Sequence, residues 1–375
     1  MKIARIEPIC VGFPMKKPVF MAGVEIRRAD NVLVRIESDT GVVGWGEAAS
    51  APTMTGETVE SMMAAVAYLT PAVLGRLAED IAGASTAMNG RMYANQAAKA
   101  AIEIALHDLV GRATSKPAYA LLGTKVRSRI AVLGVISNGE LAADLRDAAA
   151  KKADGFMAFK IKVGIAQPLA DAERTRRVCE TLGPGCLISS DANTGWSAAE
   201  AMQYVGAVAG SGLTFFEQPV AADDIAAMAA VSAAAGAGLA IGADESIHSL
   251  ADIRRHHDNE AARGVSLKTI KLGGMRGVFA AGMLCEELGM AVNVSCKTGE
   301  SSIAGAAGLH IAAALPQLAW GLTLSNEGLS EDVTARPIRI AHGHVEVSDR
   351  PGLGIDVDED RIRRHQRDVV RRQVA

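Results

Sequence analysis

Residues 156–163 read Phe-Met-Ala-Phe-Lys-Ile-Lys-Val, and this stretch decides the fold. It is an apolar run bounded by Gly155 and Gly164, a pattern typical of a buried β-strand. Because successive side chains of a strand point to opposite faces, Lys160 and Lys162 share one face. An unpaired ammonium is costly to bury, so the two lysines lie either on a wet edge strand or in a site that uses them. The rest of the chain favours the site.

Similar β-like runs recur along the chain, with alanine-rich helical stretches between them. The runs are 130–136, 156–163, 186–190, 213–216, 239–243, 265–270, 290–296 and 322–324. Eight βα units within roughly 200 residues predict an α/β fold of the (β/α)8-barrel type over residues 126–325, with a modified first or last unit. The rival is an open doubly wound sheet. No G-x-G-x-x-G follows the first run and no P-loop occurs, so nucleotide-binding versions of that sheet lose support.

The segments on either side of the predicted barrel follow other patterns. Residues 1–50 alternate like a β-meander and residues 56–110 have helical periodicity, which predicts a separate N-terminal α+β domain over 1–125. Residues 326–375 return to strand-like alternation, at 338–340 and 344–347, before a charged tail. We expect this last segment to fold back on the N-terminal domain.

Composition excludes several classes of protein. The chain has 375 residues, 49% of them hydrophobic, which is ordinary for a globular protein with one large and one smaller domain. With a net charge of −3, the chain lacks the excess of basic residues that is typical of proteins that bind nucleic acid. No apolar run reaches the roughly 18 residues of a membrane span, and no signal-peptide core begins the chain. Five cysteines without a C-x-x-C motif indicate buried thiols in a reducing compartment, so the cytoplasm is the expected location.

Charged side chains recur where the predicted strands end. Asp191, Glu217, Asp244 and Lys268 follow one another at intervals of about 25 residues, one βα unit per step. In a parallel barrel these groups meet, with the lysine pair of the second run, at the C-terminal mouth where barrel enzymes keep their chemistry. Three converging carboxylates repel one another unless a cation neutralises them. Oxygen ligands without His or Cys select Mg²⁺, so the three acids predict a magnesium site.

Each of these residues has a simpler explanation when it is taken alone. An Asp at the end of a strand is more often the N-cap of the next helix, and Lys268 could be a surface residue. Glu217 is harder to explain in this way, because Glu caps poorly and two phenylalanines precede it. Such groups at the ends of five consecutive strands favour a common site.

These motifs resemble those of the enolase superfamily, in particular the muconate-lactonizing-enzyme (muconate cycloisomerase) subgroup of the mandelate racemase/muconate lactonizing enzyme family. The matching motifs are Lys160-x-Lys162, Asp191-x-Asn193, Glu217-Gln-Pro, Asp244-Glu-Ser and Lys268-x-x-Lys271-x-Gly-Gly, with Gly44-Trp-Gly-Glu47 in the N-terminal domain. Mandelate-racemase relatives would place a His at the end of the seventh strand and an Asp on the sixth. This chain has Cys296-Lys297 and Lys268 there, which favours the subgroup with two lysines.

The resemblance implies a modified TIM barrel under an N-terminal capping domain and a Mg²⁺-dependent isomerase, expected as a homo-oligomer. Its substrate would be a small carboxylate whose α-proton is removed while the metal stabilises the enolate. Lys162 would act on one face of the enolate and Lys268 on the other, and Lys160 would favour the neutral form of Lys162 and contact the carboxylate. Racemisation, epimerisation and cycloisomerisation all fit this arrangement.

Two other functions stay open at this stage. A dehydratase of a hydroxy acid or a hydroxylated imino acid would use the same lysine pair. A barrel that only binds an anion through its lysines is the non-catalytic alternative. The Asp-x-Asp that dipeptide epimerases of this subgroup carry near the eighth strand is missing from residues 323–327, which makes that activity less favoured.

Substrate contacts are expected from loops around the mouth. Residues 13–24, which include Phe20, and residues 48–55 resemble the two lid loops of the family, although an exposed hairpin is an equal alternative for the first. The other candidates for substrate contact are Asn193, Lys297, Glu300 and Glu327, which follow strand ends. The last three could equally be ordinary loop charges.

Overall fold

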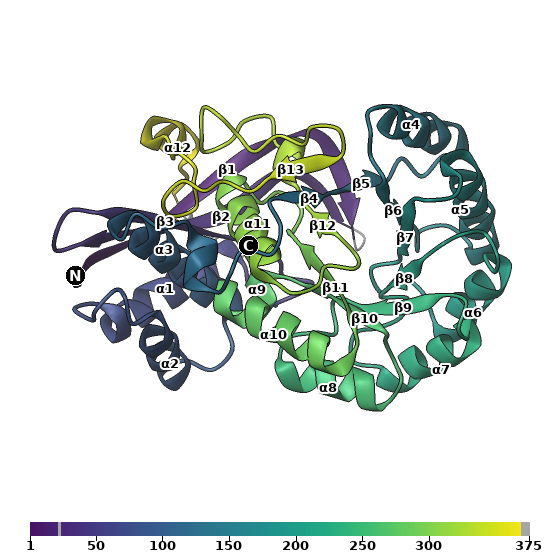
Figure 1. Cartoon of the computed structure of the whole chain (residues 1–375), viewed down its shortest axis with the longest axis horizontal. Coiled ribbons are helices and arrows are strands. Elements are labelled where there is room, and N and C mark those ends of the chain that lie inside the picture. The colour runs from purple at the N-terminus through teal and green to yellow at the C-terminus, as the bar shows by residue number, and fades with distance from the viewer. Residues whose placement is uncertain (22–23, 369–375) are drawn as a thin grey trace, which may run out of the picture.

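The computed structural model describes residues 1–21 and 24–368. Eight parallel strands, β5 to β12, form one sheet in chain order. A bridge between Val132 and Leu322 joins its first and last strands. Figure 1 shows this barrel with helices around its outside, and the N-terminal α+β domain beside it. The predicted class, a (β/α)8-type barrel with an N-terminal α+β domain, is confirmed.

The barrel strands are short and alternate with helices, except that two helices follow β10. The strands are β5 (Leu133–Ile136), β6 (Ala158–Lys162), β7 (Leu187–Asp191), β8 (Phe215–Glu217), β9 (Ala240–Ala243), β10 (Gly264–Leu267), β11 (Ala291–Ser295) and β12 (Leu322–Thr323). The helices are α4 (Leu141–Ala153), α5 (Pro168–Leu182), α6 (Ala198–Ala207), α7 (Ile225–Ala235), α8 (Leu250–Asp258), α9 (Thr269–Leu272), α10 (Met275–Leu288) and α11 (Ser302–Ala314). In the described chain β12 is followed by the 3-10 turn η2 (Asn326–Gly328) and then by the C-terminal segment, without a barrel helix of its own, so the last unit is the modified one.

The first predicted run, residues 130–136, is divided between two sheets. β4 (Arg129–Ala131) pairs antiparallel with β13 (His344–Glu346), and only β5 belongs to the barrel. The prediction of one strand was wrong here, because a continuous apolar run does not show where a chain passes from one sheet to another.

The N-terminal domain consists of an antiparallel sheet and helices packed against it. Its elements are β1 (Ile3–Met21), β2 (Val24–Ser38), β3 (Val43–Ala49), α1 (Val59–Val73), α2 (Ile81–Arg91), α3 (Gln96–Ala113) and the 3-10 turn η1 (Ala118–Leu121). The long helix α3 is buried along most of its length and contacts both β3 and the barrel helix α9. A Cβ atom at Gly46 of β3 would lie 1.9 Å from the carbonyl oxygen of Ala101, so only glycine allows this approach.

Of the first expected lid loop, the described residues 13–21 and 24 lie in paired strands. β1 and β2 remain paired as far as Met21 and Val24, with an irregularity between Pro14 and Val19. The first expected lid loop is therefore an arm of a β-hairpin, which was the alternative that the sequence left open.

The C-terminal segment carries less strand than its alternation predicted. Residues 338–340 have no regular structure, and β13 is the only described strand after β12. The helix α12 (Glu359–His365) packs against β1, and the N–H of Arg367 donates to the carbonyl oxygen of Cys10 at 2.9 Å. The end of the described chain thus lies on the N-terminal domain.

The five cysteines are free. Four of them are buried and Cys186 is half-buried. Burial raises the pKa of the Cys179 thiol to about 11, so this thiol stays protonated near neutral pH. Within the described ranges, no helix combines the length and apolar character needed to cross a membrane.

Candidate active site

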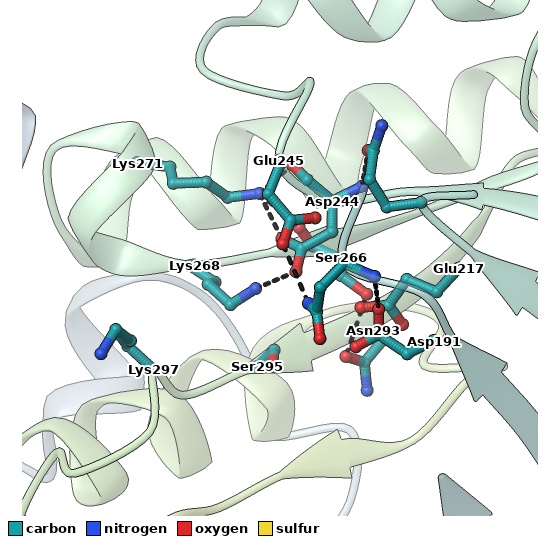
Figure 2. A network of polar contacts seen from close by, with 12 residues as sticks. Asp191, Glu217, Asp244, Glu245, Ser266, Lys268, Lys271, Asn293, Ser295 and Lys297 are labelled. Carbon is teal, nitrogen blue, oxygen red and sulfur yellow. Dashed lines mark hydrogen bonds and ion pairs between the residues drawn. The ribbon is translucent and has the colours of Figure 1, made fainter. Parts of the chain in front are cut away.

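The predicted catalytic and metal-binding side chains meet at the C-terminal ends of five neighbouring barrel strands. Lys160 and Lys162 lie on β6, Asp191 ends β7, Glu217 ends β8, Asp244 follows β9 and Lys268 follows β10. Strand register explains the convergence, because Lys162 is directly opposite Asp191, which is directly opposite Glu217. All six side chains line one cavity of about 1200 Å³, the mouth cavity. Figure 2 shows the amino group of Lys268 pointing at Asp244, with Glu217 and Asp191 on the other side of Asp244.

Each of the three carboxylates is paired with a lysine. Lys160 Nζ donates to Glu217 Oε2 at 2.6 Å, and Lys162 Nζ donates to Asp191 Oδ2 at 2.6 Å. Lys268 forms the third pair, with Asp244. The acids are almost fully buried, with 1% of each residue exposed, so solvent screens these pairs little.

The pKa values follow from burial and from these pairs. Burial would raise the pKa of Asp191 and of Asp244, but the neighbouring lysines hold both below their usual range. Burial raises the pKa of Glu217, and the attraction of Lys160 offsets this only in part. Burial lowers the pKa of Lys268, but Asp244 more than offsets the effect, so the pKa lies above its usual range and the side chain is an ammonium.

The three carboxylates fit a hard cation by their chemistry. They supply only oxygen donors, and Glu217 Oε1 is buried without a hydrogen-bond partner, which leaves this atom available to a ligand. No group of three His, Cys, Asp or Glu side chains in the described chain is already spaced as a cage for an ion. The reason is visible in the ion pairs, because lysine amino groups lie between the acids. Asp191, Glu217 and Asp244 could therefore hold a cation once their oxygens turn from the lysines.

Two residues outside the predicted set hold Asp244 in place. Lys271 Nζ donates to Asp244 Oδ1 at 2.6 Å and to the Asp244 carbonyl oxygen. Gln218 Oε1 accepts from the N–H of Asp244 at 2.9 Å and from the hydroxyl of Ser246 at 2.9 Å. The signal for both residues was sequence adjacency, since Lys271 shares a motif with Lys268 and Gln218 follows Glu217.

The turn that carries both lysines differs from its prediction. Strand β10 ends at Leu267, and Thr269 begins the one-turn helix α9, whereas the sequence predicted a strand over 265–270. The helical turn brings Lys268 and Lys271 to the same carboxylate, which a continuous strand would not do, because residues three apart on a strand point to opposite faces.

Asn193 lies in the mouth cavity but both of its polar atoms are already used. Its Oδ1 accepts from Lys162 Nζ at 2.7 Å, and its Nδ2 donates to Glu245 Oε1 at 2.9 Å. Asn193 therefore positions Lys162 in this structure, in addition to any contact with a substrate.

The other predicted substrate contacts divide into three groups. Lys297 and Glu327 line the mouth cavity. Glu300 is buried, does not line the cavity in this structure and accepts a hydrogen bond from the N–H of Lys297 at 2.9 Å, so its contact with a substrate stays a prediction. The side chain of Phe20 lies outside the described part of the chain.

The N-terminal domain contributes to the walls of the mouth cavity. Met15, Lys17 and Val19 of the β1–β2 hairpin line it, together with Met54 from the second expected lid segment. A second cavity, of about 550 Å³, lies between α11 and the C-terminal segment and contains none of the six charged residues. The site is thus formed by both domains.

Comparison with known proteins gives the family. Residues 5–123 match the mandelate racemase/muconate lactonizing enzyme N-terminal domain, and residues 143–361 match the enolase C-terminal domain-like family. The chain is 30% identical to a chloromuconate cycloisomerase from Cupriavidus necator over 98% of this chain and 100% of that protein. It is 30% identical to an N-succinyl-L-Arg/Lys racemase from Bacillus cereus over 96% of this chain and 97% of that protein.

Solved structures agree with the sequence relatives. The fold matches the muconate lactonizing enzyme from Pseudomonas fluorescens, complexed with muconolactone, with a TM-score of 0.92 and 28% identity over 98% of this chain and 99% of that one. The two family models together cover most of the chain. The cycloisomerase and the racemase are both isomerases, and each is matched over nearly its full length. The chain is therefore an enzyme of the enolase superfamily and belongs to its mandelate racemase/muconate lactonizing enzyme family.

Proposed function

We propose that this enzyme is a Mg²⁺-dependent isomerase that removes the proton α to a carboxylate, as a racemase, an epimerase or a cycloisomerase of a small carboxylic acid. One observation carries the proposal. Lys162 ends β6 and Lys268 directly follows β10, and these two strands are separated by three strands in either direction around the eight-stranded barrel. The two amines thus approach the carboxylate cluster from opposite walls.

The acids between the two lysines would bind the metal. Asp191, Glu217 and Asp244 end the three intervening strands and offer only oxygen donors, as Mg²⁺ prefers. Mg²⁺ bound there would supply the positive charge that stabilises an enolate.

The lysines would move the proton. We assign to Lys162 the removal of the α-proton from one face, and to Lys268, held as an ammonium beside Asp244, the delivery of a proton to the other face. The roles exchange for the opposite antipode. Both lysines are ion-paired in this structure, Lys162 with Asp191 and Lys268 with Asp244. Whichever lysine acts as the base must first lose its proton, because an ammonium has no lone pair with which to accept one. Lys160, bonded to Glu217, lies two residues from Lys162 on the same face of β6 and would contact the substrate carboxylate.

The relatives favour isomerisation over the dehydration that the sequence left open. A cycloisomerase and a racemase match this chain over 98% and 96% of its length. In cycloisomerisation only one lysine would act on carbon, whereas racemisation needs both. A homo-oligomer and a cytoplasmic location remain predictions from the sequence.

Deuterium exchange tests the proposal. A library of carboxylic acids is incubated with the enzyme in D₂O, with Mg²⁺ or with EDTA, and followed by mass spectrometry. We expect α-deuteration of at least one acid that requires Mg²⁺ and occurs without loss of water. Exchange that persists in EDTA would contradict the metal's role, and a mass loss of 18 would instead support the dehydratase.

A further inference from the structure

We infer that Arg174 of α5 is a positioning residue for Lys162, because it holds the backbone at the end of β6 and so places the lysine amine for proton transfer. The inference rests on the proposed function and deepens it. It comes from one contact, in which the Arg174 guanidinium donates to the carbonyl oxygen of Lys162 at 2.6 Å. Arg174 thus acts on the backbone of the lysine, whose amine is bonded to Asp191 and Asn193.

The carbonyl group of Lys162 lies beyond the end of the neighbouring strand. β5 ends at Ile136, which is directly opposite the residue before Lys162. The N–H of Val163 donates to the carbonyl oxygen of Asp191 on β7 at 3.0 Å. In a trans peptide the carbonyl points away from the following N–H, so that of Lys162 is directed to the side of β5. A buried carbonyl needs a donor, and Arg174 supplies the one that β5 no longer provides.

Two buried acids hold the guanidinium in this orientation. Asp171, on the same helix, accepts from Arg174 at 2.8 Å, and Asp144 of α4 forms a second ion pair with it. All three residues are buried, with at most 6% of any one of them exposed. The helices α4 and α5 pack against each other beside β6 (Figure 1). A planar guanidinium serves three acceptors in fixed directions, which a single amine does not do equally well.

The same acids fix the turn that follows Lys162. Asp171 Oδ2 accepts from the N–H of Gly164 at 2.9 Å, and Gly164 has a φ of +92°, a conformation that favours glycine. Asp144 Oδ1 accepts from the N–H of Asn138, in the segment after β5, at 3.0 Å. The guanidinium and its two acids therefore join the segments that follow β5 and β6.

The amine of Lys162 depends on this anchor more than the amine of Lys268 does. Lys162 is the last residue of β6 and 28% of its side chain is exposed, so the position of its backbone limits where Nζ can reach. Lys268 follows β10 on the opposite wall and is held by Asp244. A displacement of about 1 Å can slow a reaction step about 100-fold. A change at Arg174 should therefore slow proton transfer at one face of the substrate.

Exchange of separate antipodes tests the inference. Arg174→Lys keeps the charge between the two acids but replaces the planar fork by a single amine. With the acid that exchanges its α-proton in D₂O, we expect this variant to slow exchange of the antipode that depends on Lys162 by roughly 10–100-fold, and to change exchange of the other by less than about twofold. Equal slowing of both antipodes would show a general structural effect, and unchanged exchange of both would show no role. Either result would overturn the inference.

Amide hydrogen exchange measures the anchor without turnover. In Arg174→Lys we expect peptides that cover residues 160–166 to exchange at least about tenfold faster, and peptides from β10 and β11 to exchange as in the wild type. Unchanged amide exchange over residues 160–166 would overturn the inference, whether or not the enzyme removes an α-proton. Failure of the proposed function would appear separately, as the absence of metal-dependent α-proton exchange in the wild type.

Two further variants separate positioning from misfolding. Arg177→Lys makes the same replacement at an exposed position of α5 outside the cavity and should leave both measurements unchanged. Asp171→Asn keeps the guanidinium but leaves one side-chain oxygen to serve both Arg174 and the N–H of Gly164. It should slow the same antipode as Arg174→Lys, by at least about threefold. Equal effects of Asp171→Asn on the two antipodes would contradict the inference.

Discussion

Glu47 of the N-terminal domain caps a helix of the barrel through Ser301. Its carboxylate accepts from the N–H of Ser301 at 2.9 Å and from the hydroxyl at 2.7 Å, and also from the N–H of Ala304 at 3.0 Å. Ser301 is the N-cap of α11, directly after the turn that carries Lys297. The N-terminal domain therefore contacts the barrel at two places near the site. Glu47 holds the start of α11, next to the turn that carries Lys297, and the β1–β2 hairpin lines the mouth cavity.

A second carboxylate of the N-terminal domain acts in the same way. Glu103 of α3 accepts from the N–H of Met275 at 2.7 Å and of Arg276 at 3.0 Å, at the start of α10. Negative charge at a helix N-terminus is favourable because it pairs with unsatisfied N–H groups. The two contacts bind the domains together next to the catalytic strands.

Removal of the Glu47 carboxylate should destabilise the fold. Glu47→Ala leaves the N–H groups of Ser301 and Ala304 buried without partners, and we expect a loss of about 2–4 kcal/mol in the free energy of unfolding. Urea denaturation measures the loss. Glu7→Ala, which removes a partly exposed carboxylate paired with Arg5 on the same sheet, should change stability by less than about 0.5 kcal/mol. Equal stabilities of the two variants would show that the contact between Glu47 and Ser301 has no energetic role.

Magnesium should stabilise the folded enzyme through Asp244. A ligand that binds only the folded state at about 100 times its Kd adds about 2.7 kcal/mol, which raises Tm. Asp244→Asn should lose this response, and it should also be less stable without metal, because Lys268 and Lys271 lose their common counterion.

Asp223→Asn is the matched control for the magnesium experiment. Asp223 is exposed, and the substitution makes the same change of charge outside the cavity. Its Tm should rise with Mg²⁺ as in the wild type. A full Mg²⁺ response in Asp244→Asn would remove Asp244 from the metal site.

Glu300 should make stability depend on pH. Burial and the repulsion from Glu47 raise its pKa to about 8 in the folded enzyme, compared with the usual 4.5 of a free Glu side chain. The group's contribution to stability is therefore complete below about pH 4.5, falls as the pH rises towards 8, and stays constant above that.

The substitution Glu300→Gln isolates this contribution. The amide keeps an acceptor for the N–H of Lys297 but does not ionise. Between pH 5 and pH 8 we expect the wild type to lose on the order of 3 kcal/mol of unfolding free energy relative to Glu300→Gln, measured by urea denaturation at each pH. A constant difference between the two proteins over this range would show that Glu300 ionises in the fold as it does in water.

The positions of Asp191, Glu217 and Asp244 could be predicted because topology determines them. Parallel strands end at one edge of a barrel, and one acid per βα unit places all of them at that edge. The direction of a side chain could not be predicted in the same way. Glu300 follows a strand end, but its carboxylate turns back towards the local backbone and does not face the cavity. Contacts between distant segments, such as that of Glu47 with Ser301, leave no local pattern in a single sequence.

Strand boundaries were the other part that the sequence did not determine. Residues 265–270 are apolar enough for a strand, but tertiary contacts make Thr269 the start of a helical turn. The same holds for residues 130–136, where the change of sheet follows from pairing with β13. Neither boundary is marked by the local pattern of apolar residues.

Exchange of the α-proton in separate enantiomers tests the roles of the two lysines most directly. The acid that exchanges in D₂O with Mg²⁺ is supplied as each pure antipode to the wild type, Lys162→Ala and Lys268→Ala. We expect Lys162→Ala to lose exchange of one antipode by about 10²–10⁴-fold and to retain the other, and Lys268→Ala to show the opposite pattern, while both variants still bind Mg²⁺. Undiminished exchange of both antipodes in either variant would contradict the assignment of these lysines to opposite faces of the substrate.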